Sequence, residues 1–148
     1  LDRLKDWVAR GREAGIVAFD TETNALDAVR CDLVGFSLAV APGEACYVPL
    51  LHRGGADLFG GGLLPDQIPT ADAIAALRPL MEDKAVLKIG QNVKFDWLVL
   101  SRYGLDVAPT DDTMLMSYVL DAGKGSHGMD DLAERHLGHR TIRYAEVA

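Results

Sequence analysis

The feature that most restricts the fold is the apolar run at residues 16–19, which ends directly at the acidic sequence DTET of residues 20–23. A short apolar run of this kind predicts a buried β-strand. Because residues two apart in a strand point to the same side, Asp20 and Glu22 present two carboxylates to one spot. Ionised carboxylates repel each other and are costly to desolvate. A divalent cation between them is the simplest explanation of the pair.

A second cluster, QNVKFD at residues 91–96, follows another short apolar run. On a helix that begins after Asn92, residues 92 and 96 share a face. If that face turns toward the end of the first strand, Asn92 and Asp96 approach Asp20 and Glu22. Three carboxylates in one place suggest two-metal phosphoryl chemistry, in which one ion activates a water and the other stabilises the leaving oxygen. The alternative is that Asp20 only caps a turn and that Asp96 is a solvated helix residue.

Composition limits the classes of protein to consider. The 148 residues suffice for one domain with a core, and 49% hydrophobic with 25% charged residues is ordinary for a globular protein. The net charge of −7 argues against long-range binding of a nucleic-acid duplex. No apolar run is long enough to cross a membrane. Cys31 and Cys46 lack metal-site spacing and are expected to be reduced thiols in a cytoplasmic protein. The start without Met or signal pattern suggests a piece of a longer protein.

The order of predicted elements indicates an α/β domain, with a mixed sheet and helices packed on it. Thr70 or Asp72, Asn92, and Asp111 or Asp112 are candidate N-caps for three of the helices. Residues 41–44 read as a hairpin turn, and residues 52–69 as a loop. We expect helices at residues 2–12, 70–83, 92–103, 112–120 and 129–137, and strands at residues 16–20 (buried on both faces), 33–40, 45–50 and 85–89.

Taken together, the motifs resemble the proofreading 3′-5′ exonuclease domains of bacterial DNA polymerase I, a family within the carboxylate-dependent exonucleases of ribonuclease-H-like fold. FDTETNALD at residues 19–27 resembles the first exonuclease motif, and KIGQNVKFD at residues 88–96 resembles the second. The segments LVGFS, YVP, DTML and MDDLAER, which begin at positions 33, 47, 112 and 129, also resemble the family in the right order. The resemblance covers essentially the whole chain.

The resemblance implies roles for individual residues. Asp20 would bridge two divalent metal ions, Glu22 would bind the first, and Asp96 would hold the second, partly through water. Mg²⁺ is the expected ion, with Mn²⁺ or Zn²⁺ as alternatives. The substrate would be the single-stranded 3′ end of DNA, and a polymerase domain of the same parent chain would be the partner. Four positions match the substrate side of the family's site (Thr23, Leu26, Gln91 and Asn92), with Leu26 as a wedge against the terminal bases, and Tyr144 matches an aromatic that stacks on a base.

One departure concerns the third motif of the family, a Tyr followed four residues later by an Asp in a late helix. Residues 1–148 do not contain it, and Tyr118 and Asp121 are only three apart and match another part of the family. We therefore expect a partial exonuclease domain whose C-terminal helices are truncated and whose own activity is weak or absent. Loss of those helices would expose apolar surface, through which the fragment is expected to form a homo-oligomer.

Three other functions compete with this reading. The first is a catalytically silent structural domain of a polymerase, and the second is an RNA-trimming relative of the same exonuclease superfamily. The third is a phosphatase built around Asp-x-Asp-x-Thr. Intact carboxylates at positions 20, 22 and 96 count against the silent domain. Glu22 stands where the phosphatase motif has its second Asp, which counts against the phosphatase.

Overall fold

The computed structural model describes residues 1–55, 61–142 and 146, and its centre within these residues is a five-stranded mixed sheet. The strand order is β3-β2-β1-β4-β5. The first three strands along the chain form antiparallel pairs, while β4 pairs parallel with β1 and β5 pairs parallel with β4. The strands are β1 (Ile16–Thr23), β2 (Leu33–Ala41), β3 (Glu44–Pro49), β4 (Leu87–Gly90) and β5 (Thr110–Asp112). The predicted mixed sheet flanked by helices is confirmed.

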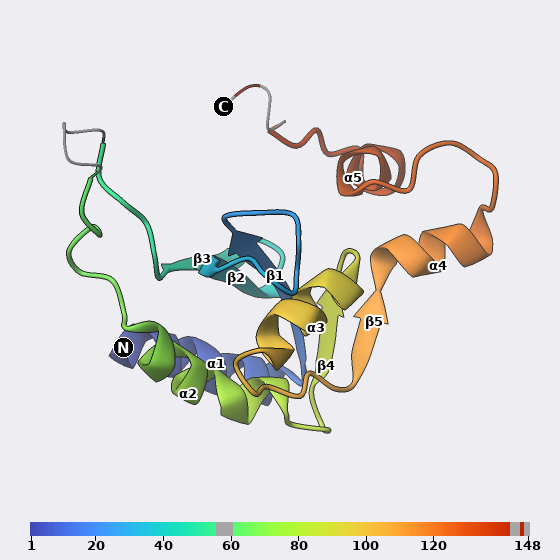
Figure 1. Ribbon diagram of the computed structural model, residues 1–148. Coiled ribbons are helices and arrows are strands. Elements are labelled where there is room, and N and C mark those ends of the chain that lie inside the picture. The colour runs from blue at the N-terminus through green and yellow to red at the C-terminus, as the bar shows by residue number, and fades with distance from the viewer. Residues whose placement is uncertain (56–60, 143–145, 147–148) are drawn as a thin grey trace.

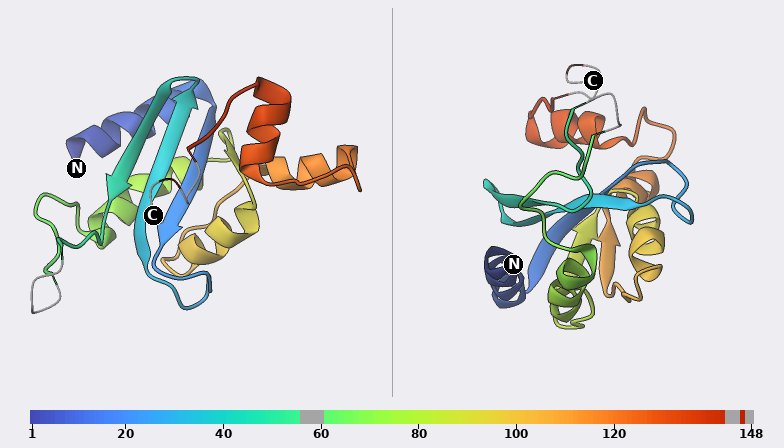
Figure 2. Two further views of the ribbon diagram at one scale, coloured as in Figure 1. Left: turned by 90° about the horizontal axis from the view of Figure 1, so that it is seen from above. Right: turned by 60° about the vertical axis from the view of Figure 1, so that its left-hand side comes forward.

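Helices lie on both sides of this sheet, but they cover it unequally (Figures 1 and 2). Three helices pack against one face. After β5 the chain leaves the sheet through α4, and α5 then lies over the opposite face. The helices on the covered face are α1 (Asp2–Ala14), α2 (Thr70–Met81) and α3 (Val93–Ser101), and those that follow are α4 (Thr113–Leu120) and α5 (Met129–Leu137). The main core therefore lies between the sheet and the first three helices.

Strand β1 is buried on one face only, so the prediction of burial on both faces is wrong. Val17 and Phe19 point into the core and are 1% and 4% exposed, while Ile16 on the opposite face is 41% exposed. The physical reason is that α1, α2 and α3 all lie on one side of the sheet, and Val17 and Phe19 belong to the core cluster. The side that carries Asp20 and Glu22 is consequently the open face of the sheet.

The boundaries differ from the predictions where the sequence signal is short. Strand β5 spans three residues, too few for a visible alternation, and it forms because it can pair in parallel with β4. Strand β4 begins at Leu87 rather than at residue 85. Helix α1 continues to Ala14, where Gly15 at φ 71° closes it by donating its N–H to the Gly11 carbonyl at 3.2 Å. The predicted hairpin turn is confirmed, and Gly43 in it has φ 78°.

One of the three predicted N-caps is wrong, and the other two residues occupy the N-cap positions as predicted. Pro69 occupies the N-cap position of α2, so Thr70 is already helical. Asn92 occupies the N-cap position of α3 at φ 59°, but its side chain makes no capping hydrogen bond. Asp112 caps α4 and accepts hydrogen bonds from the N–H groups of Met114 and Leu115 at 2.9 and 3.2 Å.

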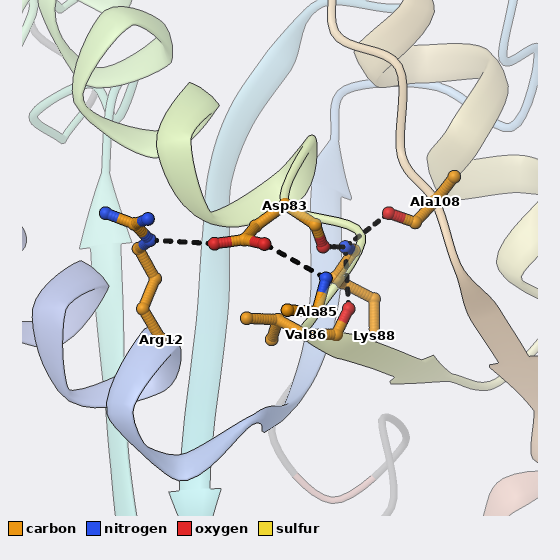
Figure 3. Close-up of polar contacts among 6 residues, drawn as sticks. All are labelled: Arg12, Asp83, Ala85, Val86, Lys88 and Ala108. Carbon is orange, nitrogen blue, oxygen red and sulfur yellow. Dashed lines mark hydrogen bonds and ion pairs between the residues drawn. The ribbon is translucent and has the colours of Figure 1, made fainter.

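A fully buried lysine anchors the start of β4 (Figure 3). Lys88 donates from Nζ to the carbonyl oxygens of Asp83, Val86 and Ala108 at 2.7, 2.8 and 2.5 Å. Burial lowers the pKa of Lys88, and the nearby charge of Asp83 opposes that shift. The ammonium group thus joins the turn after α2 to the segment that leads into β5, and this fixes β4 and β5 side by side.

The described residues bear on two further expectations from composition. None of their helices has the length and apolar character needed to cross a membrane. Cys31, which is buried, and Cys46, which is partly buried, are both free thiols, as predicted.

Candidate active site

The two carboxylates of β1 lie on the open face of the sheet near the end of the strand. Asp20 is partly buried and Glu22 is exposed. Their antiparallel partners on β2 are Ser37 and Gly35, respectively. Because Cβ atoms alternate along a strand, Asp20 and Glu22 point to the same side, as predicted.

Asp96 reaches the same region from the first turn of α3. It is 2% exposed, and its Oδ1 accepts hydrogen bonds from the N–H and the Oγ1 of Thr21 at 2.9 and 2.5 Å. These bonds fix the carboxylate against the backbone of β1, between the positions of Asp20 and Glu22 in the sequence. The alternative reading of Asp96 as a solvated helix residue is therefore wrong.

The pKa of Asp20 responds to burial and to the two other carboxylates. The pKa of Asp20 is raised to about 6, chiefly by burial and then by the negative charges of Asp96 and Glu22, in that order of importance. Burial also raises the pKa of Asp96, while the hydrogen bonds from Thr21 lower it. A cation placed among these groups would relieve both the repulsion and the cost of desolvation.

The described residues do not, however, enclose an ion by themselves. No three of their His, Cys, Asp and Glu side chains converge closely enough to form a complete metal site. An ion held by Asp20 with Glu22 or Asp96 would need additional oxygen ligands from water or from a phosphate. Mg²⁺ suits such a site, because it commonly keeps several waters and binds through one or two carboxylates plus substrate phosphate.

Asp112 does more than cap α4, the role that the sequence predicted for it. Besides capping α4, its carboxylate accepts hydrogen bonds from the N–H groups of Asn92 and Val93 at 3.1 and 2.9 Å. One side chain therefore ties together the N-termini of α3 and α4 and sets the position of Asp96, one turn into α3. The sequence shows the Asp before the helix but gives no sign of the bonds to α3, which depend on β4 and β5 being neighbours.

Gln91 and Asn92, predicted on the substrate side, lie at the turn between β4 and α3. The side-chain amide of Gln91 accepts a hydrogen bond from Thr113 Oγ1 at 2.5 Å and donates to the His127 carbonyl at 2.7 Å. Gln91 thus also joins this turn to the segment between α4 and α5. Asn92 is exposed.

Leu26 lies in the loop that follows β1, and its side chain is 96% exposed. The loop is closed at its base, where Asn24 donates from Nδ2 to Asp32 at 2.9 Å and accepts from the Asp32 N–H at 2.8 Å. Thr23 donates from Oγ1 to the Ala25 carbonyl at 2.8 Å. A leucine held in solvent by an ordered loop is available to contact a ligand. Tyr144 lies outside the described residues.

Comparison with known proteins identifies the kind of protein to which this site belongs. The sequence profile of the 3′-5′ exonuclease family of A-type DNA polymerases matches residues 1–148. The chain belongs to this 3′-5′ exonuclease family. The recognition of the two exonuclease motifs is therefore confirmed.

Individual relatives agree with the family. The chain is 54% identical over 155 residues to DNA polymerase I of Rhizobium leguminosarum. The matched region covers 98% of this chain but only 15% of that protein. It is also similar to a solved structure titled POL domain of Pol1 from M. smegmatis in complex with DNA primer-template and dNTP (TM-score 0.71, 20% identity, 98% of this chain and 23% of that one). Escherichia coli RNase D, an exoribonuclease, shares the fold (TM-score 0.70, 16% identity, 99% of this chain and 34% of that one). The predicted ribonuclease-H-like α/β fold is confirmed.

Proposed function

We propose that the chain is the proofreading 3′-5′ exonuclease domain of a bacterial DNA polymerase I, which removes mismatched nucleotides as monophosphates from a DNA 3′ end. The observation that carries this proposal is that the buried Asp96 of α3 is hydrogen-bonded to Thr21, the residue of β1 that lies between Asp20 and Glu22. A cation near these carboxylates would offset their mutual repulsion and the cost of burying Asp20. Membership of the 3′-5′ exonuclease family indicates the type of reaction, the removal of nucleotides from a 3′ end.

In this proposal Asp20, Glu22 and Asp96 hold two divalent ions, with Mg²⁺ as the expected metal and Mn²⁺ or Zn²⁺ as alternatives. When bound, such ions activate a water and stabilise the leaving oxygen of a phosphodiester. Asp96 is kept in place by Thr21 and Asp112, and Asp20 is kept in place by the sheet. The chain's own contribution is therefore the pair Asp20 and Glu22 on the open face, with Asp96 fixed beside them at the end of β1.

The substrate is proposed to be the frayed single strand at a DNA 3′ end. Leu26, which is 96% exposed in the loop after β1, is proposed to wedge against the terminal bases. Thr23, Gln91, Asn92 and Tyr144 are the other proposed substrate contacts. With a net charge of −7, the chain offers little long-range attraction for DNA. Most of the binding to the duplex would therefore come from a polymerase domain of the same protein. The proposed location of that protein is the cytoplasm.

The third family motif is absent from residues 1–148, and we propose that this chain alone is feebly active for that reason.

The surface of the chain supports a related proposal, that the chain associates with itself. Apolar side chains of α4 and α5 are widely exposed: Leu115 (55%), Val119 (84%), Leu120 (78%), Met129 (56%) and Leu137 (78%). A cavity of about 460 Å³ also separates α5 from Ala18 and Ile89 of the sheet. Sedimentation showing only monomers of the chain would contradict self-association.

The decisive experiment follows the digestion of a 5′-labelled single-stranded DNA with Mg²⁺ or Mn²⁺, using the full-length protein that carries this sequence. A stepwise ladder is expected, and both chelation and Asp20→Ala should abolish it. An RNA of the same sequence, digested in parallel, tests the RNA-trimming alternative. RNase D, an exoribonuclease, shares this fold, so RNA is a reasonable second substrate to test. A folded protein that degrades neither substrate would leave the structural domain as the better reading.

A further inference from the structure

Tyr47 of β3 lies on the same face of the sheet as the proposed catalytic carboxylates. Its register partner on β2 is Ser37, and the partner of Ser37 on β1 is Asp20. Residues in register across a sheet present their side chains to the same side. Tyr47 and Asp20 therefore occupy one row of the open face, two strands apart.

The side chain of Tyr47 leans along the sheet toward Glu22. A Cβ atom added to Gly35 would lie 2.1 Å from the Tyr47 hydroxyl and 2.6 Å from Cζ, so the hydroxyl rests directly on the bare backbone of Gly35. Gly35 is the register partner of Glu22. The absence of a side chain at position 35 thus opens a path by which the phenol reaches the strand position beside Glu22.

Electrostatics agree with this placement. Burial raises the pKa of Tyr47, and the negative charge of Glu22 raises it further. The second contribution requires the two groups to be neighbours. Within the described residues no donor hydrogen-bonds the Glu22 carboxylate, whereas Asp96 has two bonds from Thr21. Glu22 is also exposed, and its longer side chain has more rotatable bonds to restrain than an aspartate has.

His52 holds the phenol in this position. The Tyr47 hydroxyl and His52 Nε2 are 2.6 Å apart, and the two rings meet edge to face with centroids 5.5 Å apart. The backbone of His52 is fixed in turn by Gln67, which accepts from the His52 N–H at 2.8 Å and donates to its carbonyl at 3.0 Å. When His52 donates from Nε2, the phenol oxygen is the acceptor and the O–H of Tyr47 remains able to donate elsewhere.

We propose that Tyr47, held by His52, is a positioning residue whose O–H donates to the Glu22 carboxylate and orients it for a divalent cation. This inference rests on the proposed function. Residues that hydrogen-bond a metal ligand from behind restrict its orientation, and their loss typically costs 10- to 100-fold in metal affinity or activity. Tyr47 would fill this role for Glu22, which, like Asp20, accepts no side-chain hydrogen bond from the described residues.

The test compares Tyr47→Phe with the wild type in the full-length protein, by calorimetric titration of Mn²⁺ and by DNA digestion at several Mn²⁺ concentrations. Asp20→Ala gives the background from other metal sites, and Tyr118→Phe is the matched control, since Tyr118 is an exposed tyrosine on α4. Tyr47→Phe should bind Mn²⁺ about tenfold more weakly. Digestion should slow at low Mn²⁺ and recover with excess Mn²⁺, with the KM for DNA unchanged.

A double variant separates positioning from other roles. If Tyr47 acts only through Glu22, then Glu22→Gln with Tyr47→Phe should be no worse than Glu22→Gln alone. Mn²⁺ affinity within twofold of wild type in Tyr47→Phe would overturn the inference while leaving the proposed function intact. An increased KM for DNA with unchanged Mn²⁺ affinity would overturn it too, by making Tyr47 a DNA contact. A wild-type protein that binds no more Mn²⁺ than Asp20→Ala would overturn both proposals.

Discussion

Thr21 donates two hydrogen bonds to Asp96, a residue 75 positions later in the chain, and so fastens the first turn of α3 to the end of β1. One bond comes from the backbone and would form with any residue except proline at position 21. The other comes from the hydroxyl, at 2.5 Å, and depends on this side chain. The pair couples the stability of the fold to the geometry of the proposed catalytic carboxylates.

Replacing that hydroxyl should therefore harm both stability and activity. Thr21→Val keeps the shape of the side chain but removes one hydrogen bond to a buried carboxylate, which should lower the free energy of unfolding by about 1–3 kcal/mol. Urea denaturation measures the first effect and DNA digestion the second. Thr110→Val on β5, where the threonine is exposed, should change neither. Wild-type stability in Thr21→Val would contradict the assigned role of the hydroxyl.

Asp20 should make the metal-free chain less stable as the pH rises. Its pKa is about 6 in the folded chain against an ordinary value of 3.8, so the folded state binds the proton more tightly than the unfolded state does. The contribution of Asp20 to stability is thus complete below about pH 4 and is lost as the pH rises to about 6. The full shift corresponds to about 3 kcal/mol, and partial exposure of the group reduces this to about 1–2 kcal/mol.

Asp20→Asn removes this titration. In EDTA at pH 7.5, the variant should be about 1–2 kcal/mol more stable than the wild type, and the difference should shrink toward pH 4. Denaturant unfolding at several pH values measures it. A variant that is less stable than the wild type at pH 7.5 would show that the Asp20 carboxylate is not strained in the metal-free fold.

Divalent metal should reverse that instability. If Mn²⁺ binds the folded chain only, a concentration 100 times the Kd should add about 2.7 kcal/mol to the free energy of unfolding, and EDTA should remove it. Thermal denaturation with and without Mn²⁺ measures the shift in Tm. Asp20→Asn should lose most of the shift, whereas Asp66→Asn, remote from the carboxylates in sequence, should keep it. An equal shift in Asp20→Asn would place the metal elsewhere.

Lys88 should be indispensable to the fold although it takes no part in the proposed chemistry. Its ammonium group serves three carbonyl oxygens and is fully buried, so Lys88→Met leaves three acceptors without their donor (Figure 3). Breaking a buried charged contact of this kind costs about 3–5 kcal/mol. Chemical denaturation should show this loss, while Lys84→Met, at an exposed position, should cost almost nothing. A small effect of Lys88→Met would mean that water replaces the ammonium group.

Leu26 should affect the reaction without affecting stability. Because its side chain is 96% exposed, Leu26→Ala removes almost no buried surface and should leave the free energy of unfolding within about 0.5 kcal/mol of wild type. Loss of the wedge against the terminal bases should slow digestion several-fold. Val29→Ala, on the same loop and 60% exposed, is the matched control. Equal rates in wild type and Leu26→Ala would remove Leu26 from the proposed substrate site.

The strands and helices with strong periodicity were predictable, and so were Asp20 and Glu22, because alternation along one strand places them on one side whatever the rest of the chain does. The family motifs likewise needed only the sequence. The three-residue β5 and the true N-cap of α2 were not predictable, since short elements are decided by a neighbouring strand or by local backbone geometry rather than by composition. The burial of β1 on one face only was misjudged for a different reason, since it depends on which face of the sheet the helices α1, α2 and α3 cover.

By itself, then, the sequence determined which side chains are proposed to carry the chemistry and the local spacing that pairs them within a strand or a helix turn. Only the tertiary structure decided that Asp96 bonds to Thr21, that Asp112 joins two helix N-termini, and that Tyr47 lies across Gly35 toward Glu22. Those contacts join residues from separate elements. They exist because the parallel pairing of β4 with β1 and of β5 with β4, and the antiparallel pairing of β1, β2 and β3, bring these elements together with a fixed register.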